Sequence, residues 1–190
     1  MTVTADLDAR FRDAAARAGL LDAAYDIVDS PVGPLLVAAS GRGLLRVSFD
    51  PYLELALERE LERLGRLAGP RVLRAPRMVD NVRRELDEYF EQRRDRFDLT
   101  LDLRGITPFS VRVLGELALV PYGRTATYGE LAARAGKPGA ARAVGTIMNR
   151  NPVPIVLPCH RIVGSTGALV GYGGGLERKE LLLRLEGACI

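Results

Sequence analysis

The sequence predicts an α+β protein in two parts: a small N-terminal α/β domain with an antiparallel sheet, residues 1–103, and a mainly helical C-terminal domain, residues 104–190. Three observations predict this. Short apolar segments separated by turn residues occupy the chain between residues 24 and 49, as in β-hairpins. Charged segments with apolar residues at helical spacing follow them. Beyond Pro108 the spacing of apolar residues is again that of helices.

The elements of the N-terminal domain follow from the spacing of its apolar and turn residues. Residues 7–18 have the pattern of a short amphipathic helix. Residues 24–28, 35–38 and 44–49 predict two or three antiparallel strands joined by short turns. Residues 52–67 and 77–94 are predicted helices. Residues 97–103 alternate at period two, which predicts a further strand.

The C-terminal domain begins after a break at residues 104–108. Pro108 suits the first turn of a helix that runs to Val120, because the N–H that proline lacks would have no partner there. Thr127 and Glu130 have the spacing of a capping box, which predicts that a second helix begins at Thr127 and runs to about residue 135.

A third helix is predicted over residues 140–149, after a tight turn at residues 136–139. Two short helices joined by a glycine-containing turn resemble a helix-turn-helix, although any αα-hairpin gives the same pattern. The third helix carries four small residues, Ala140, Ala141, Ala143 and Gly145. They would let this helix approach DNA or a neighbouring helix closely. A last helix over residues 176–186 closes the chain.

Composition limits the class of protein. The 190 residues are 47% hydrophobic and 27% charged, as in ordinary globular proteins, and no apolar run reaches the ~18 residues that a membrane helix needs. The acidic start lacks the pattern of a secretory signal, so we expect a cytoplasmic protein. Two cysteines, Cys159 and Cys189, with one histidine cannot furnish a disulfide framework or a four-ligand zinc site. We therefore expect no metal and no cofactor.

Charge is distributed unevenly along the chain. Residues 1–103 hold 16 basic and 19 acidic side chains, whereas residues 104–190 hold 11 and 5. Six basic residues and a single acid, Glu130, lie between Leu117 and Leu176. Such a basic region suits a polyanion such as nucleic acid, although a merely uneven surface charge would look the same.

The segment Leu157–Val163 places a cysteine beside the only histidine of the chain, as Cys159-His160. A thiol attacks as the thiolate, and a free cysteine with a pKa of about 8.5 is mostly protonated at neutral pH. An imidazole next to the thiol can handle its proton, so the pair predicts a nucleophile and its base. A buried, inert cysteine beside a turn histidine is the alternative.

The wider pattern resembles the O6-alkylguanine-DNA alkyltransferases, or methylated-DNA–protein-cysteine methyltransferases. Their active-site signature matches Leu157-Pro-Cys-His-Arg-Ile-Val163. Six further blocks fall in the family's order and spacing: Pro108-Phe109, Val120–Gly123, Thr127–Ala132, Ala141–Gly145, Asn151–Pro154 and Gly171–Leu176. The match is dense over residues 105–187 and loose before them. It implies that the C-terminal domain is winged-helix-like and enters the minor groove of DNA.

The resemblance implies a DNA-repair reaction. An alkylated guanine is flipped out of duplex DNA, and the cysteine takes the alkyl group from O6 in one irreversible displacement, so each protein acts once. O4-alkylthymine is implied as a second substrate. The expected partner is double-stranded DNA that contains alkylated bases, and the protein is expected to act as a monomer.

Carried over residue by residue, the family's catalytic group falls on four positions. Cys159 is the nucleophile, and His160 activates it through a water. Glu186 matches the carboxylate that orients the histidine, as in a hydrolase triad, and Asn151 matches the asparagine that braces the active-site backbone. Taken alone, Glu186 would be a solvated helix residue and Asn151 part of an Asn-Pro turn.

The resemblance also implies how DNA is held. Tyr128 matches the tyrosine that pushes on the target phosphate, and Arg142 matches the arginine that fills the vacated stack. Taken alone, Tyr128 would be a core residue and Arg142 a surface charge. Three small residues lie on the DNA-contacting helix: Ala141, Ala143 and Gly145. Six positions match the alkylguanine pocket: Tyr128, Met148, Pro154, Ile162, Tyr172 and Gly173.

The sequence departs from the family pattern at two positions. Leu114 stands where tryptophan is common, which predicts a change in packing. Gly173 stands where some members carry serine, and we hypothesise a pocket that tolerates alkyl groups larger than methyl. A benzyl transfer rate far below the methyl rate would contradict this hypothesis.

Three other functions stay open at this point. A lesion-binding relative without transfer activity would lack the cysteine, which is present as Cys159. A thiol hydrolase could use Cys159, His160 and Glu186, and it would turn over many times. A helix-turn-helix regulator without chemistry would not depend on the cysteine.

Overall fold

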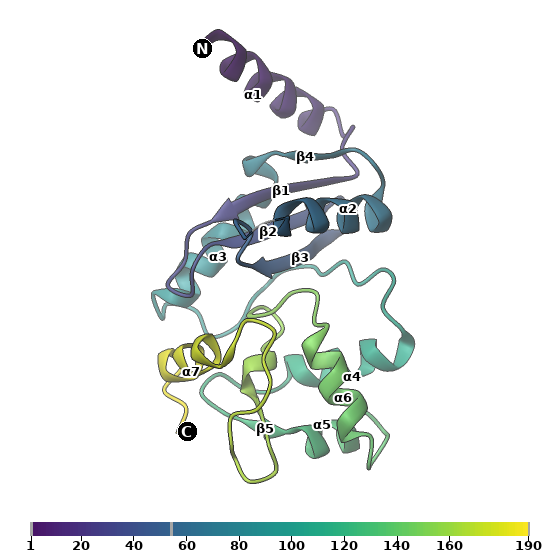
Figure 1. The fold of residues 1–190 in the computed structure, drawn as a ribbon, viewed down its shortest axis with the longest axis vertical. Coiled ribbons are helices and arrows are strands. Elements are labelled where there is room, and N and C mark those ends of the chain that lie inside the picture. The colour runs from purple at the N-terminus through teal and green to yellow at the C-terminus, as the bar shows by residue number, and fades with distance from the viewer. Residues whose placement is uncertain (1, 54, 190) are drawn as a thin grey trace. The chain divides into compact units, whose positions relative to one another are not determined.

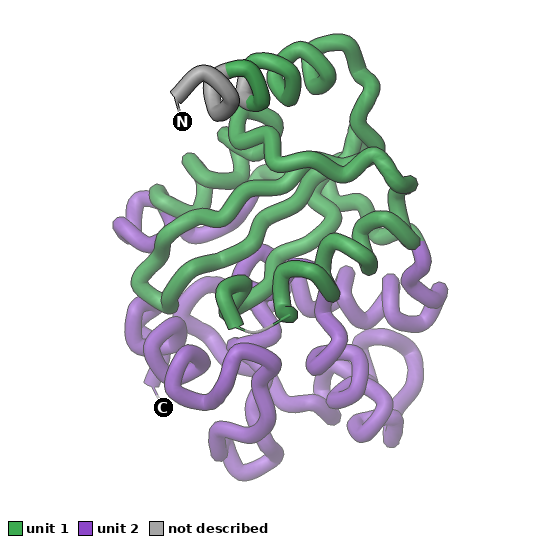
Figure 2. Tube along the Cα trace, turned by 45° about the horizontal axis from the view of Figure 1, so that its top comes forward, with its two compact units in different colours: residues 1–88, 98–104 green, residues 89–97, 105–190 purple. Residues whose placement is uncertain are grey.

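The computed structural model of the chain describes residues 2–53 and 55–189. Its backbone separates into two compact units (Figure 2). Unit 1 comprises residues 1–88 and 98–104, and unit 2 comprises residues 89–97 and 105–190. Each unit has its own buried apolar residues, so each is described by itself. None of the described helices is long and apolar enough to span a bilayer.

Unit 1 contains a four-stranded sheet in the order β3-β2-β1-β4 (Figure 1). Its strands are β1 (Ala23–Val28), β2 (Leu35–Ser40), β3 (Gly43–Phe49) and β4 (Val72–Arg74). The pairs β1–β2 and β2–β3 are antiparallel, as the turn-separated apolar segments predict. β4 pairs with β1 in parallel and was not predicted, because three residues are too few to show a strand pattern.

Helices cover both faces of this sheet. These are α2 (Ala56–Ala68) and α3 (Asp80–Phe90); unit 1 also contains α1 (Thr2–Arg17) and the 3₁₀ helix η1 (Pro76–Val79). Leu64 of α2 packs against Leu36 and Ala38 of β2, while α3 lies on the opposite side (Figure 1). Every residue of β2 is buried, since successive side chains point to the two covered faces.

The strand predicted over residues 97–103 is wrong. Within this segment only Leu101 makes a β-bridge, in parallel with Leu44, among the described residues. Next to this bridge the carboxylate of Asp102 accepts hydrogen bonds from Ser40 Oγ (2.6 Å) and Arg104 Nε (2.8 Å). The alternation therefore marks an extended segment beside β3 rather than a strand.

Unit 2 is mainly helical, as predicted. Its helices are α4 (Pro108–Ala118), α5 (Tyr128–Arg134), α6 (Ala141–Asn149), the 3₁₀ helix η2 (Cys159–Arg161) and α7 (Leu176–Leu185). Two short parallel strands, β5 (Ala126–Thr127) and β6 (Ile162–Val163), complete it. The capping box at α5 is confirmed, because Thr127 and Glu130 each accept a hydrogen bond from the other's backbone N–H. α3 ends in this unit, which begins at Tyr89.

Candidate active site

Cys159 opens η2 at the end of a loop that Asn151 braces. Asn151 Nδ2 donates to the Leu157 carbonyl at 2.8 Å and to Cys159 Sγ at 3.1 Å, while its Oδ1 accepts from Val153 N at 3.1 Å. Within this loop Ile155 has a φ of 75°, which is costly for a β-branched residue. The structure thus brings Asn151 to Cys159 and shows what holds the loop in its unfavourable conformation.

The Cys159 side chain is buried, with 4% of its surface exposed. Burial raises the pKa of its thiol to about 11, against the hydrogen bond from Asn151 and the charge of Lys179, both of which lower it. At neutral pH the resting residue is therefore a thiol. Any nucleophilic role requires a group that takes its proton.

His160 and Glu186 form a buried pair. His160 Nε2 lies 2.8 Å from Glu186 Oε1, and both side chains are inaccessible to solvent. Burial lowers the pKa of His160 although Glu186 opposes this shift. Burial alone would raise the pKa of Glu186, but hydrogen bonds from His160 and Arg161 lower it to about 2. The pair at neutral pH is a neutral imidazole beside a carboxylate.

This pairing fixes the tautomer of His160. An ionised Glu186 only accepts hydrogen bonds, so the imidazole proton belongs on Nε2 and the lone pair on Nδ1. Nδ1 is buried and has no hydrogen-bond partner among the described residues. The atom that can accept a proton is therefore the one that Glu186 leaves unused.

Sequence reasoning missed most of the groups that hold Glu186. Arg161 Nε donates to Oε2 at 2.9 Å, Arg161 Nη2 to Oε1 at 2.9 Å, Tyr89 OH to Oε1 at 2.7 Å and Gly123 N to Oε2 at 3.2 Å. Arg161 Nη1 also donates to the Val120 carbonyl at 2.6 Å. These contacts give a physical role to two of the sequence blocks quoted above, Val120–Gly123 and the arginine after the Cys-His pair.

Lys179 is a second functional candidate that was not predicted. Its side chain is fully buried, and Nζ donates to the carbonyls of Ile162 at 2.5 Å and Val170 at 2.8 Å. Burial lowers its pKa to about 8. Lys179 thus ties residues 164–175 to the strand after Cys159. The signal was present, because a lysine three and four residues from Leu182 and Leu183 lies on the buried face of a helix.

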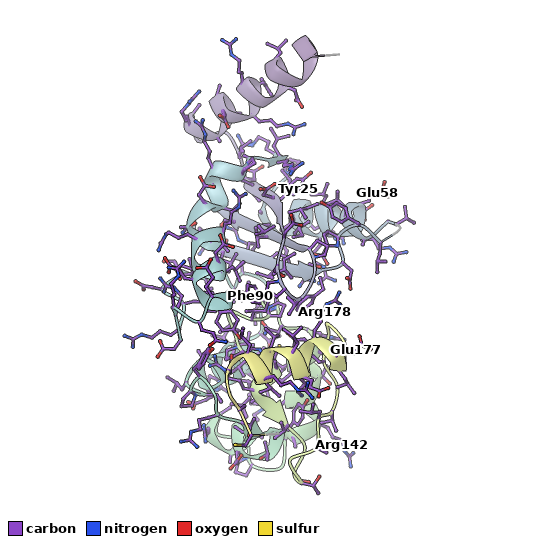
Figure 3. All side chains as sticks on the ribbon, turned by 90° about the vertical axis from the view of Figure 1, so that its left-hand side faces the viewer. Tyr25, Glu58, Phe90, Arg142, Glu177 and Arg178 are labelled. Carbon is purple, nitrogen blue, oxygen red and sulfur yellow. The ribbon has the colours of Figure 1, made fainter. Side chains whose placement is uncertain are left out.

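Tyr128 lies between α6 and the loop of residues 164–175. Its ring faces Gly145, where a Cβ would stand 3.9 Å from two ring carbons, so the small residue allows α6 to pack on the tyrosine. Its hydroxyl donates to the Val170 carbonyl at 3.2 Å. Of the other residues predicted on this helix, Ala141 is half-buried and Ala143 is exposed. Arg142 is also exposed (Figure 3).

The residues predicted for the alkylguanine pocket differ in exposure. Met148, Pro154 and Ile162 are buried, Tyr172 is half-buried and Gly173 is exposed. The Tyr172 ring stands edge-on to His160, with 6.5 Å between ring centroids. A separate cavity of about 430 Å³, lined by Phe109, Leu114, Ile147 and other residues, contains none of the six predicted pocket residues.

Comparison with known proteins gives matches to both halves of the chain. The family model for the DNA binding domain of 6-O-methylguanine DNA methyltransferase matches residues 108–188. The model for the ribonuclease-like domain of the same enzyme matches residues 23–103.

Curated relatives match over most of their length. A methylated-DNA–protein-cysteine methyltransferase of Mycolicibacterium paratuberculosis is 43% identical over 164 residues, which is 85% of this chain and 91% of the relative. The protein of the same name from Methanosarcina barkeri is 40% identical over 169 residues, which is 85% of this chain and 96% of the relative.

Solved structures of proteins with related names are also similar to this chain. The crystal structure of Mycobacterium tuberculosis OGT in complex with DNA has a TM-score of 0.73 and 39% identity, and covers 86% of this chain and 92% of that one. The O6-methylguanine-DNA methyltransferase of Pyrococcus kodakaraensis has a TM-score of 0.61 and 28% identity, and covers 87% of this chain and 99% of that one.

Proposed function

Because the chain belongs to the 6-O-methylguanine DNA methyltransferase family, we propose that it repairs DNA by moving the alkyl group of O6-alkylguanine onto Cys159. The observation that carries this proposal is two buried hydrogen-bonded pairs, Asn151–Cys159 and His160–Glu186, whose thiol and neutral base come from adjacent residues of η2. The reaction class is that of a methylated-DNA–protein-cysteine S-methyltransferase.

The transfer is a single displacement. The Cys159 proton passes through a water to Nδ1 of His160, and Glu186 stabilises the imidazolium that results. The sulfur then forms a bond to the alkyl carbon while the bond from that carbon to O6 breaks. The guanine keeps the electron pair of the broken bond and takes up a proton as it leaves. The product is a thioether, and regenerating the thiol would require a second nucleophile to displace the Cys159 thiolate from the alkyl carbon, so the protein acts once.

Asn151 serves this step in two ways. Its hydrogen bond to Sγ stabilises the thiolate, because it lowers the pKa that burial raises. Its bonds to Leu157 and Val153 hold the loop that aims the sulfur. Asn151 is therefore both a partner of the nucleophile and a brace.

DNA is bound through α6 and Tyr128. Arg142 and Ala143 are exposed on α6, where a planar guanidinium can fill the space that a flipped base leaves. The Tyr128 hydroxyl gives up its contact to Val170 in order to reach the backbone phosphate. Ala141 and Gly145 let the helix approach closely, and the flipped base lies among Tyr128 and the other five predicted pocket residues.

The protein acts as a monomer in the cytoplasm, on duplex DNA that carries O6-alkylguanine or O4-alkylthymine. Two free cysteines, Cys159 and Cys189, suit a reducing compartment. One active site with all its described groups in unit 2 needs no second copy.

The test compares variants in which one or the other of the two free cysteines, Cys159 and Cys189, is replaced. Duplex DNA with a labelled O6-methylguanine is mixed with the wild type, Cys159→Ala and Cys189→Ala. We expect label on the wild type and on Cys189→Ala, and none on Cys159→Ala, which should still bind DNA. Cys189 is the other free cysteine of the described chain and is exposed, whereas Cys159 is buried, so Cys189→Ala is a matched control for the loss of a thiol. Equal labelling of both variants would refute the proposal.

A further inference from the structure

The carboxylate of Glu186 has more donors than one histidine supplies. Oε1 accepts from His160 Nε2 at 2.8 Å, from Tyr89 OH at 2.7 Å and from Arg161 Nη2 at 2.9 Å. A carboxylate oxygen offers about two lone-pair sites, so three donors compete for it. Each donor draws on negative charge that would otherwise stabilise a protonated His160.

Tyr89 is held firmly in this arrangement. Its side chain is fully buried, and its ring lies against Phe90, Phe97 and Tyr122, with centroids 5.3, 5.3 and 6.1 Å away. Burial and the neighbouring Glu186 raise the pKa of its hydroxyl, so the phenol stays protonated and always donates. Its effect on Glu186 is therefore permanent at working pH.

The position of Tyr89 in the chain is informative. It lies near the end of α3, inside residues 23–103 that match the ribonuclease-like domain, whereas Glu186 lies in the DNA binding domain match, residues 108–188. Both residues nevertheless belong to unit 2. The segment of sequence assigned to one family domain thus supplies a contact to a group in the other.

We infer that Tyr89 is a positioning residue of the transfer reaction, whose hydroxyl keeps His160 a weak base by withholding part of the Glu186 charge from it. The inference rests on the proposed role of His160 as the base for Cys159. The other charged or titratable groups near the imidazole are Arg161, Lys179, Cys159 and Tyr172. A Tyr89→Phe change removes no atom from any of them.

The single histidine makes a direct test possible. In the full-length chain labelled with ¹³C,¹⁵N-histidine, His160 gives one imidazole signal, which is titrated by NMR in the wild type and in Tyr89→Phe. We expect the midpoint in the variant to rise by about 0.5 to 1 pH unit, the size that the loss of one neutral hydrogen bond allows. Tyr122→Phe is the matched control, because its hydroxyl donates to the Leu185 carbonyl at 3.2 Å instead of to the carboxylate.

Each outcome decides the inference. Identical titration curves for the wild type and Tyr89→Phe overturn it, including the case in which neither titrates before acid unfolding. A lower midpoint, or an equal rise in Tyr122→Phe, also overturns it. The second readout is the rate of transfer from O6-benzylguanine as a function of pH. The pH at which this rate falls on the acid side should be higher in Tyr89→Phe, by as much as the NMR midpoint. If that pH is the same in both proteins, Tyr89 has no role in transfer.

The titration needs no alkyl transfer, so the two proposals can fail separately. If the midpoint rises but Cys159 takes no alkyl group, the proposed function fails and the electrostatic effect of Tyr89 stands. If transfer occurs but the midpoint does not move, only the inference about Tyr89 fails.

Discussion

At the scale of single residues, two glycines near the active site differ in how strongly the backbone requires them. Gly123 has a φ of 69°, and a Cβ there would stand 2.7 Å from the Glu186 carbonyl oxygen. Its N–H also donates to the Glu186 carboxylate. Gly173 has no such constraint, since a Cβ would meet only Asn149 O, at an ordinary 3.8 Å. The same residue type is thus required at one position and replaceable at the other.

These two positions give a matched pair of variants. Gly123→Ala should lower the free energy of unfolding by about 2 kcal/mol or more, because alanine disfavours the left-handed conformation and its Cβ collides with backbone. Gly173→Ala should change it by less than about 0.5 kcal/mol. Urea denaturation followed by circular dichroism measures both. Equal effects on stability would show that the backbone of residue 123 is not constrained as described.

At the scale of elements, the helix pair α5–α6 was readable from local sequence. The capping box at Thr127 and Glu130 depends on residues three apart, and it is confirmed. β4 was missed, and residues 97–103 were wrongly predicted as a strand, because pairing depends on partners far away in the chain. The small residues of α6 left two alternatives open, close approach to DNA or to a neighbouring helix. At Gly145 the structure shows close packing against the ring of Tyr128 in α5.

Arg142 provides the prediction at this scale. If its guanidinium fills the gap that the flipped base leaves, Arg142→Ala should slow repair of duplex DNA by about tenfold, the equivalent of one lost stacking contact. Transfer from the free base O6-benzylguanine should not change. Arg184→Ala, an exposed arginine on α7, is the control and should leave both rates unchanged. Equal losses on duplex and free base would contradict the stacking role.

At the scale of the whole molecule, the site depends on contacts that no local pattern reveals. The hydrogen bond between Tyr89 and Glu186 spans 97 residues, and nothing in the sequence around Tyr89 marks it. Glu186 itself was identified only through the family resemblance, since a glutamate at a helix end is usually solvated. The local Cys159-His160 pair predicted the chemistry, whereas the set of groups that hold Glu186 required the folded chain.

The buried carboxylate also makes stability depend on pH. The pKa of Glu186 is lowered from 4.5 to about 2 in the folded protein, so its ionised form stabilises the fold above about pH 4.5. This contribution, on the order of 3 kcal/mol, is lost as the pH falls from about 4.5 towards 2. In Glu186→Gln the melting temperature should therefore fall less steeply with acid than in the wild type. If the melting temperatures of the wild type and of Glu186→Gln fell equally between pH 7 and pH 3, Glu186 would not be the source of this pH dependence.

The most direct measurement of the central claim is the intact mass of the protein after incubation with excess O6-methylguanine duplex DNA, followed by peptide mapping. The account predicts the addition of one methyl group per chain, located on the peptide that contains Cys159, with no further DNA repaired once the protein is used up. An unmodified protein that continues to demethylate DNA, or a methyl group located on another residue, would contradict it.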